Sequence, residues 1–147
     1  MSLKDRLLED MKSAMKKKDT IRKSTITMVR AAILQKEKDE KVKLDDAGVV
    51  GIIAKEVKQR KDSIPEFERG NRPDLVDKLN TEINILMEYL PQQLTEKEIG
   101  KIVLQTISEV GATGMKDMGK VMGALMPRLK GRADGKLING MARKHLQ

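Results

Sequence analysis

The stretch from Lys116 to Lys144 combines many cations with several glycines and few acids, a combination suited to binding a polyanion. Asp117 and Asp134 are its only acids. Lysine and arginine side chains bind phosphate oxygens through charge-assisted hydrogen bonds. The stretch therefore predicts a surface for a nucleic-acid backbone. Its candidate contact residues are Lys116, Lys120, Lys130, Arg132, Lys136, Arg143 and Lys144.

Glycines at Gly119, Gly123, Gly131 and Gly135 lie among these cations. A glycine inside a helix costs about 1 kcal/mol relative to alanine. Gly119 and Gly123 therefore favour a close approach by another backbone, either a packed helix or a bound ligand. The backbone N–H groups between Gly131 and Lys136 are further candidates for phosphate contacts at a helix start.

The absence of aromatic residues after Tyr89 restricts the kind of nucleic acid that this surface would recognise. Many proteins that read single strands stack bases on aromatic rings. Without such rings, recognition must depend on shape and phosphate contacts, which favours a folded RNA. The alternative is that the cations only keep a small helical unit soluble.

Residues suited to catalysis are scarce. The chain has no cysteine and one histidine, His145, and no Gly-Lys-Ser/Thr phosphate loop. Neighbouring acids such as Asp45 and Asp46 lack a metal-ligand pattern and are more simply explained as helix caps and solvated charges. The sequence predicts no catalytic residue, no metal site and no cofactor, and it leaves open whether the protein is an enzyme.

Composition indicates an all-α fold. The chain has 147 residues, 39% of them hydrophobic, but only one Phe, one Tyr and no Trp. Such a core must be built from aliphatic side chains and methionine, which suits interlocking helices better than strands. No apolar run approaches the roughly 20 residues that cross a bilayer, so neither membrane insertion nor secretion is expected. Together with the absence of cysteine, this favours a cytoplasmic location.

Charge is distributed unevenly along the chain. The net charge is +8 in total, +7 over residues 1–61, −5 over 62–99 and +6 over 100–147. Basic ends can attract a polyanion, whereas the acidic middle can meet a basic partner. In residues 1–61 the basic residues alternate with acids at helical spacing, which is typical of an ordinary solvated surface.

Four helices are expected in the first part of the chain. Ser2 and Thr20 suit the caps of the first two, Asp45 or Asp46 precedes the third, and Pro73 suits the first turn of the fourth. Pro65 predicts a kink or a stop within the third helix. The residues expected to face inward in the first two helices are Leu3, Leu7, Leu8, Met11, Met15, Ile21, Thr25, Met28, Val29, Ala32 and Ile33.

Three helices are expected after a hinge at residues 91–94. Thr95 and Glu98 form a capping-box pattern, and Gly111 is suited to end that helix. Gly131 is expected to end the glycine-containing helix, and Asp134 to cap the last one. The sequence thus predicts two helical subdomains, a four-helix unit over residues 1–92 and a three-helix unit over residues 93–147.

Several short motifs resemble the YqeY-like, or GatB/YqeY-domain, family. They are the sequences YLPQQL (89–94), EVGA (109–112), DMGKVMG (117–123), MP (126–127) and KGRADG (130–135). The resemblance covers essentially the whole chain. It implies two α-helical subdomains, of which the C-terminal one is similar to the tail domain of the B subunit of glutamyl/aspartyl-tRNA amidotransferase.

The resemblance also implies tRNA contact through the tail-like unit, at Lys120, Lys130, Arg132 and Lys136. The kinase and transamidation centres of the amidotransferase belong to other parts of that enzyme, so carbon–nitrogen ligase activity with glutamine as amido-N-donor would be an association of the family. The leading hypothesis is a tRNA-interacting accessory protein that works with amidotransferase or aminoacyl-tRNA-synthesis proteins. A protein-binding adaptor and a ligase component that requires other subunits remain alternatives. The sequence predicts no oligomeric state.

Overall fold

The fold is entirely helical. A computed structural model describes residues 1–147, and no residue lies in a strand, which confirms the all-α prediction. None of the helices is both long enough and apolar enough to cross a bilayer. The elements in chain order are α1 (Leu3–Lys16), α2 (Thr20–Glu40), α3 (Asp46–Arg69), α4 (Pro73–Met87), α5 (Glu96–Val110), the 3₁₀ turn η1 (Met115–Asp117), α6 (Met118–Leu129) and α7 (Gly135–Leu146).

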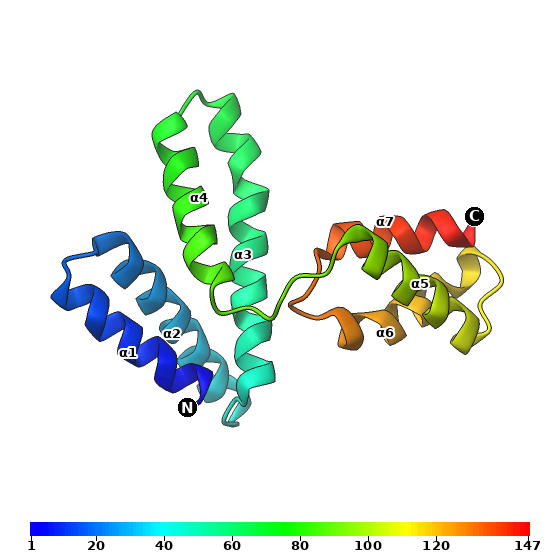
Figure 1. Ribbon diagram of the computed structural model, residues 1–147, viewed down its shortest axis with the longest axis horizontal. Coiled ribbons are helices and arrows are strands. Elements are labelled where there is room, and N and C mark those ends of the chain that lie inside the picture. The colour runs from blue at the N-terminus through cyan, green and yellow to red at the C-terminus, as the bar shows by residue number, and fades with distance from the viewer. The chain divides into compact units, whose positions relative to one another are not determined.

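The chain divides into two compact units, Met1–Leu90 and Pro91–Gln147. The first contains α1 to α4, and the second contains α5 to α7 with η1 (Figure 1). Each unit has its own apolar core. Each therefore has the buried surface that an independent folding unit needs.

The first unit is built from two helical hairpins. Helix α1 packs on α2, α3 packs on α4, and α2 contacts both helices of the second hairpin (Figure 1). The core that joins the hairpins is aliphatic, as composition predicted. Its fully buried side chains include Leu7, Ile26, Val29, Val49, Ile53 and Leu86.

Local helix signals are confirmed where they depend on nearby residues alone. Ser2 and Asp5 form a capping box on α1, and Pro73 occupies the first turn of α4. Thr95 and Glu98 form the predicted capping box on α5. Hydrogen bonds to the main chain and hydroxyl of Thr95 lower the pKa of Glu98, so this cap keeps its charge well into the acidic range.

For the first unit, the predicted cap of α2 and the predicted burial of three side chains are wrong. The cap of α2 is Asp19 rather than Thr20. Met15, Ile21 and Met28 are exposed by 52%, 37% and 52%, although the spacing placed them inward. These three side chains lie at the margins of the apolar faces of their helices. The neighbouring helices cover only the centre of the apolar face, which in α2 includes Ile26, so the margins stay exposed.

Of the kink or stop expected at Pro65, the stop does not occur, because helix α3 continues through the proline. A proline removes one backbone hydrogen bond and crowds the preceding turn. Ile64, next to the proline, packs against the core of the first unit, and α3 packs along α4. These tertiary contacts outweigh the local cost and hold the two halves of α3 in one helix.

A buried charge network joins α3 to α4. Arg60 is only 7% exposed, and its Nε donates to Oε2 of Glu82 at 2.7 Å. Its Nη1 donates to the main-chain oxygen of Glu56 at 3.1 Å and lies 3.7 Å from that residue's carboxylate. Three charged groups thus share one largely dry position between the helices.

The second unit is a three-helix bundle in which each of α5, α6 and α7 contacts the other two. Gly111 ends α5 in the left-handed conformation, with φ +67°, as predicted. The Asp134 side chain caps α7, also as predicted. The buried residues that form this core are Ile99, Val103, Val121, Leu125, Leu129, Ile138, Ala142 and Leu146.

Candidate nucleic-acid interface

The orientation of α6 is set by its apolar side. Val121, Leu125 and Leu129 are fully buried against α5 and α7. Lys120 and Gly123 lie on the exposed side, since residues one or two steps away from a buried position are rotated out of the interface. The exposed side of α6 therefore presents a cation beside a position that has no side chain.

The glycines of α6 are not explained by helix packing. A Cβ atom built at Gly119 or Gly123 would meet no atom within 4 Å. The two residues are exposed, so no neighbouring helix requires glycine at either position. Of the two explanations offered by the sequence, the packing of another helix of this chain is therefore excluded.

The loop between α6 and α7 is fixed by Gly131. This buried glycine has φ +76°, a conformation that residues with a Cβ atom disfavour. Its carbonyl oxygen accepts a hydrogen bond from Gln93 Nε2 at 2.7 Å, and the Leu94 N–H donates to the Arg132 carbonyl at 2.9 Å. The segment before α5 thus holds in place the loop that carries Lys130 and Arg132.

Two of the backbone donors expected to meet phosphate are already used. The Arg132 N–H donates to the Leu129 carbonyl at 2.9 Å, and the Lys136 N–H donates to Oδ1 of Asp134 at 2.8 Å. The Gly135 N–H, at the start of α7, has no acceptor within the chain. The Arg132 and Lys136 N–H groups are therefore used by the turn and the cap, and of these three the Gly135 N–H alone stays a candidate for a phosphate contact.

Asp117 is the N-cap residue of α6, but its side chain makes no capping hydrogen bond there. Its Oδ2 instead accepts the Thr113 N–H at 2.9 Å and so closes the turn before η1. That hydrogen bond, together with the nearby charges of Lys116 and Lys120, lowers the pKa of Asp117. The carboxylate therefore stays ionised, and it is the acid nearest in sequence to these two lysines.

Most of the candidate cations are exposed and make no internal ion pair. Salt bridges involve none of Lys116, Lys120, Lys130, Arg143 and Lys144, all of which are exposed. Lys136 is exposed in the first turn of α7, and Arg132 is half-buried in the loop. The candidate cations thus lie on η1, α6, α7 and the loop between α6 and α7, and most of their charged groups are exposed to solvent.

Arg128 shows what a structural cation looks like in the same unit. Its Nη1 donates to the Thr106 hydroxyl at 2.9 Å, and its Nη2 donates to the Glu109 carboxylate. The hydrogen bond from Arg128 lowers the pKa of Glu109. This guanidinium ties α6 to α5, which separates it from the solvent-directed lysines.

No metal-ligand cluster accompanies the basic surface. No group of three or more His, Cys, Asp or Glu side chains is placed to hold a metal ion. The single histidine, His145, is exposed in the last turn of α7. Chemically, the second unit offers charge and an accessible helix surface, which can bind a polyanion.

Sequence reasoning missed a polar cluster in the first unit, at Tyr89. The ring is 3% exposed, its hydroxyl donates to Asp10, and the guanidinium of Arg6 lies 4.6 Å from its centroid. Burial and the bond to Asp10 raise the pKa of Tyr89, so the phenol stays protonated. The only signal in the sequence was a lone tyrosine before Pro91, because its partners are some 80 positions away.

Replacing Gly131 with alanine is expected to destabilise the protein by about 1–2 kcal/mol, because a Cβ is disfavoured at this φ. The matched control is Gly123→Ala, which is expected to stabilise by about 0.5–1 kcal/mol, since that Cβ meets open space in a helix. Thermal unfolding followed by circular dichroism measures both. Shifts opposite in sign to these would contradict the described loop geometry.

Comparison with known proteins gives a family and several relatives. The family model described as Yqey-like protein matches residues 4–146. A protein of Pyrenophora tritici-repentis named Altered inheritance of mitochondria protein 41, mitochondrial, is 33% identical over 130 residues, which are 87% of this chain and 71% of that protein. The protein of the same name from Kluyveromyces lactis is 43% identical over 71% of this chain, but the match spans only 58% of that protein.

A relative with an amidotransferase name aligns with part of the chain. The E subunit of the glutamyl-tRNA(Gln) amidotransferase from Methanococcus maripaludis is 37% identical over 93 residues, which are 63% of this chain and 15% of that protein. The match supports the relation to amidotransferase subunits that the motifs indicated. It covers a small part of the archaeal protein.

The expectation of a cytoplasmic location is contradicted by these comparisons, since the fungal relatives are named as mitochondrial proteins. The expectation was based on the absence of cysteine and of a long apolar run. Neither property separates one reducing compartment from another. Composition therefore had no power to assign the compartment.

Proposed function

The chain belongs to the YqeY-like protein family, and from that premise we propose that it binds tRNA through the basic surface of its second unit, as an accessory factor to tRNA-dependent amidation. The observation that supports this most directly is that Lys116 and Lys120, exposed and without a salt bridge, lie near Gly119 and Gly123, whose Cβ positions are open. Cations that served only to stabilise the unit would be paired with acids, as Arg128 is.

Affinity in this proposal comes from phosphate contacts. Lys116, Lys120 and Lys130 carry long side chains with three donors each and no competing carboxylate in a salt bridge. The open position at Gly123 lets a sugar–phosphate backbone approach the helix closely. With no Phe, Tyr or Trp in the second unit, the preference is for the shape of a folded RNA over a single strand.

The proposed place in metabolism rests on the relatives. The match to an amidotransferase component covers 15% of that protein, and the chain has no group of three or more His, Cys, Asp or Glu side chains that could hold a metal ion. We therefore assign binding to this protein and leave amide formation to partner proteins. Any contribution to that reaction would appear as a higher rate of tRNA-dependent amidation when this chain is added to the partner enzyme.

Retention of tRNA on filters across a salt series is the first test of tRNA binding, with duplex DNA as competitor. We expect binding that weakens steeply with salt, because each neutralised phosphate releases counterions. We also expect tRNA to be retained at DNA concentrations that compete for a general polycation surface. Weak binding that duplex DNA displaces equally well would refute the proposal and leave the cations a role in solubility.

A second candidate function is a protein-binding adaptor. It is favoured by the large apolar side chains that α2 leaves exposed, with Met28 at 52% and Leu34 at 62%. Methionine-rich surfaces adapt to varied partners. A co-purifying protein that survives both nuclease treatment and high salt would favour this function over RNA binding.

A further inference from the structure

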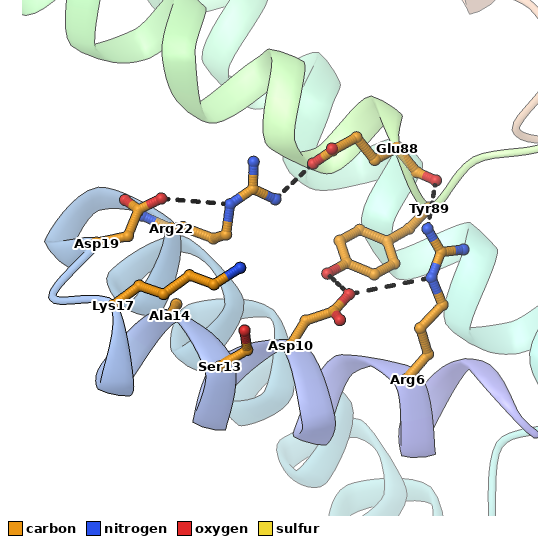
Figure 2. A pocket seen from close by; sticks show the side chains of 9 residues that line it. All are labelled: Arg6, Asp10, Ser13, Ala14, Lys17, Asp19, Arg22, Glu88 and Tyr89. Atoms are coloured by element: carbon orange, nitrogen blue, oxygen red, sulfur yellow. Dashed lines mark hydrogen bonds and ion pairs between the residues drawn. The ribbon is translucent and has the colours of Figure 1, made fainter.

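A polar cavity in the first unit is not used by the proposed RNA surface. It has a volume of about 350 Å³ and lies between α1, the start of α2 and the end of α4 (Figure 2). This volume is at the small end of the range for ligand sites. Ala14, which is 2% exposed, is the one aliphatic residue of its lining.

Two arginines of the lining are held in fixed orientations. Arg6 lies over the Tyr89 ring and donates from Nη2 to the Glu88 carbonyl at 3.1 Å. Arg22 donates from Nη1 to the Glu88 carboxylate at 2.6 Å, and its Nε lies 3.4 Å from Asp19. The hydrogen bond that Arg22 donates to the Glu88 carboxylate raises the pKa of Arg22, which keeps the guanidinium charged.

These contacts satisfy the acids of the cavity but not its donors. Asp10 accepts from Tyr89 and lies 4.0 Å from Arg6, and both Asp19 and Glu88 pair with Arg22. A guanidinium carries five N–H donors, and each arginine side chain makes a single hydrogen bond here. Most N–H donors of the two arginines therefore have no hydrogen-bond acceptor within the chain.

Lys17 and Ser13 add further donors. Neither the Lys17 ammonium nor the Ser13 hydroxyl makes a hydrogen bond or an ion pair within the chain, although both line the cavity. Figure 2 shows the Lys17 side chain extending beside Arg22 and the Ser13 hydroxyl directed toward the same space. Three positive and three negative side chains line the cavity, so it has a surplus of donors without a surplus of charge.

We propose that this cavity binds a small oxyanion, the phosphate or carboxylate group of a small molecule, between Lys17, Ser13 and Arg22. Fixed guanidinium groups match the planar, paired acceptors of such groups, and a flexible ammonium adds charge. The position between three helices and the size of the cavity suit a small molecule. The site lies within Met1–Leu90 and does not depend on the tRNA proposal.

Tyr89 provides a built-in reporter for the test. It is the only tyrosine of a chain without tryptophan, and it lines the cavity. Sodium phosphate and sodium malonate are titrated separately into the full-length chain at constant ionic strength, and tyrosine emission is recorded. A saturable change with phosphate alone identifies a phosphate site, and one with malonate alone or with both identifies a site that accepts carboxylates.

Variants then locate the binding. Lys17→Ala is expected to raise the Kd about tenfold or more, since it removes a charged donor. Lys16→Ala is the matched control, because Lys16 is exposed at the same helix end and does not line the cavity. It is expected to bind within about twofold of wild type. Lys17 is exposed, so its replacement should leave the thermal midpoint unchanged.

Three results would overturn the proposal. One is the absence of a saturable change with either anion, and another is equal weakening by both lysine variants, which would indicate general screening. The third is displacement of the anion by tRNA together with an equal loss of tRNA affinity in Lys17→Ala, which would make the cavity part of a polyanion surface. Loss of anion binding with intact tRNA retention would instead support the site as a separate one.

Discussion

Replacing both Lys120 and Lys130 with glutamate is expected to lower tRNA affinity about 100-fold near 0.1 M salt. Each lysine is exposed and has no salt bridge, so each is available to bind a phosphate. A charged hydrogen bond contributes about 1.5 kcal/mol or more, and about 1.4 kcal/mol corresponds to tenfold. The salt dependence should also become shallower, by about one in the logarithmic slope for each lost phosphate contact.

The matched control is Lys97→Glu with Lys101→Glu, which makes the same change of charge on α5. Both of those lysines are exposed, but they lie outside η1, α6 and α7. This variant should lose only the part of the affinity that comes from net charge. Filter retention over a salt series measures both variants, and circular dichroism checks that they are folded. Equal losses in the two variants would show that the site is not on α6 and its following loop.

Replacing Arg60 with alanine is expected to destabilise the first unit by about 3–5 kcal/mol. Arg60 is 7% exposed, and its removal would leave the carboxylates of Glu56 and Glu82, exposed by 15% and 12%, without their shared cation. Unpaired charge in a nearly dry site carries most of this cost. The matched control is Lys61→Ala, an exposed neighbour, which should change stability by no more than about 0.5 kcal/mol.

Urea unfolding followed by tyrosine emission measures this effect in the first unit alone, because the only tyrosine is Tyr89. Replacing the whole network, with Arg60→Met, Glu56→Leu and Glu82→Leu combined, should recover most of the lost stability, since no buried charge then remains. An Arg60→Ala variant that loses less than about 1 kcal/mol would show that water reaches the network and that it contributes little.

The helices and their ends follow from the sequence because their causes are local. A capping box needs residues three positions apart, such as Thr95 and Glu98, and a left-handed helix end needs a glycine such as Gly111. The first turn of α4 depends on Pro73 in the same way. The aliphatic composition likewise predicted the all-α fold. Fold class depends here on which kinds of side chain are available for the core, and composition gives this without the position of any residue.

Burial was predicted less well, because it depends on where another helix lies. Met28 follows the inward spacing of α2 but is 52% exposed. Pro65 carries a stop signal, yet contacts along α3 keep the helix continuous. In both places the decisive energy comes from residues that are distant in the sequence, so a local pattern could not predict the result.

For the basic surface and the polar cavity, too, the sequence determines some features and the tertiary structure determines the others. The sequence by itself determined that the cations from Lys116 to Lys144 are many and accompanied by few acids. Only the tertiary structure decided that Gly123 faces open space and that Gly131 holds the loop in a left-handed turn closed by Gln93. The cavity at Tyr89 depends wholly on tertiary structure, because the end of α4 must meet α1 and the start of α2, whose arginines lie 82 and 66 positions away from Glu88 in the sequence.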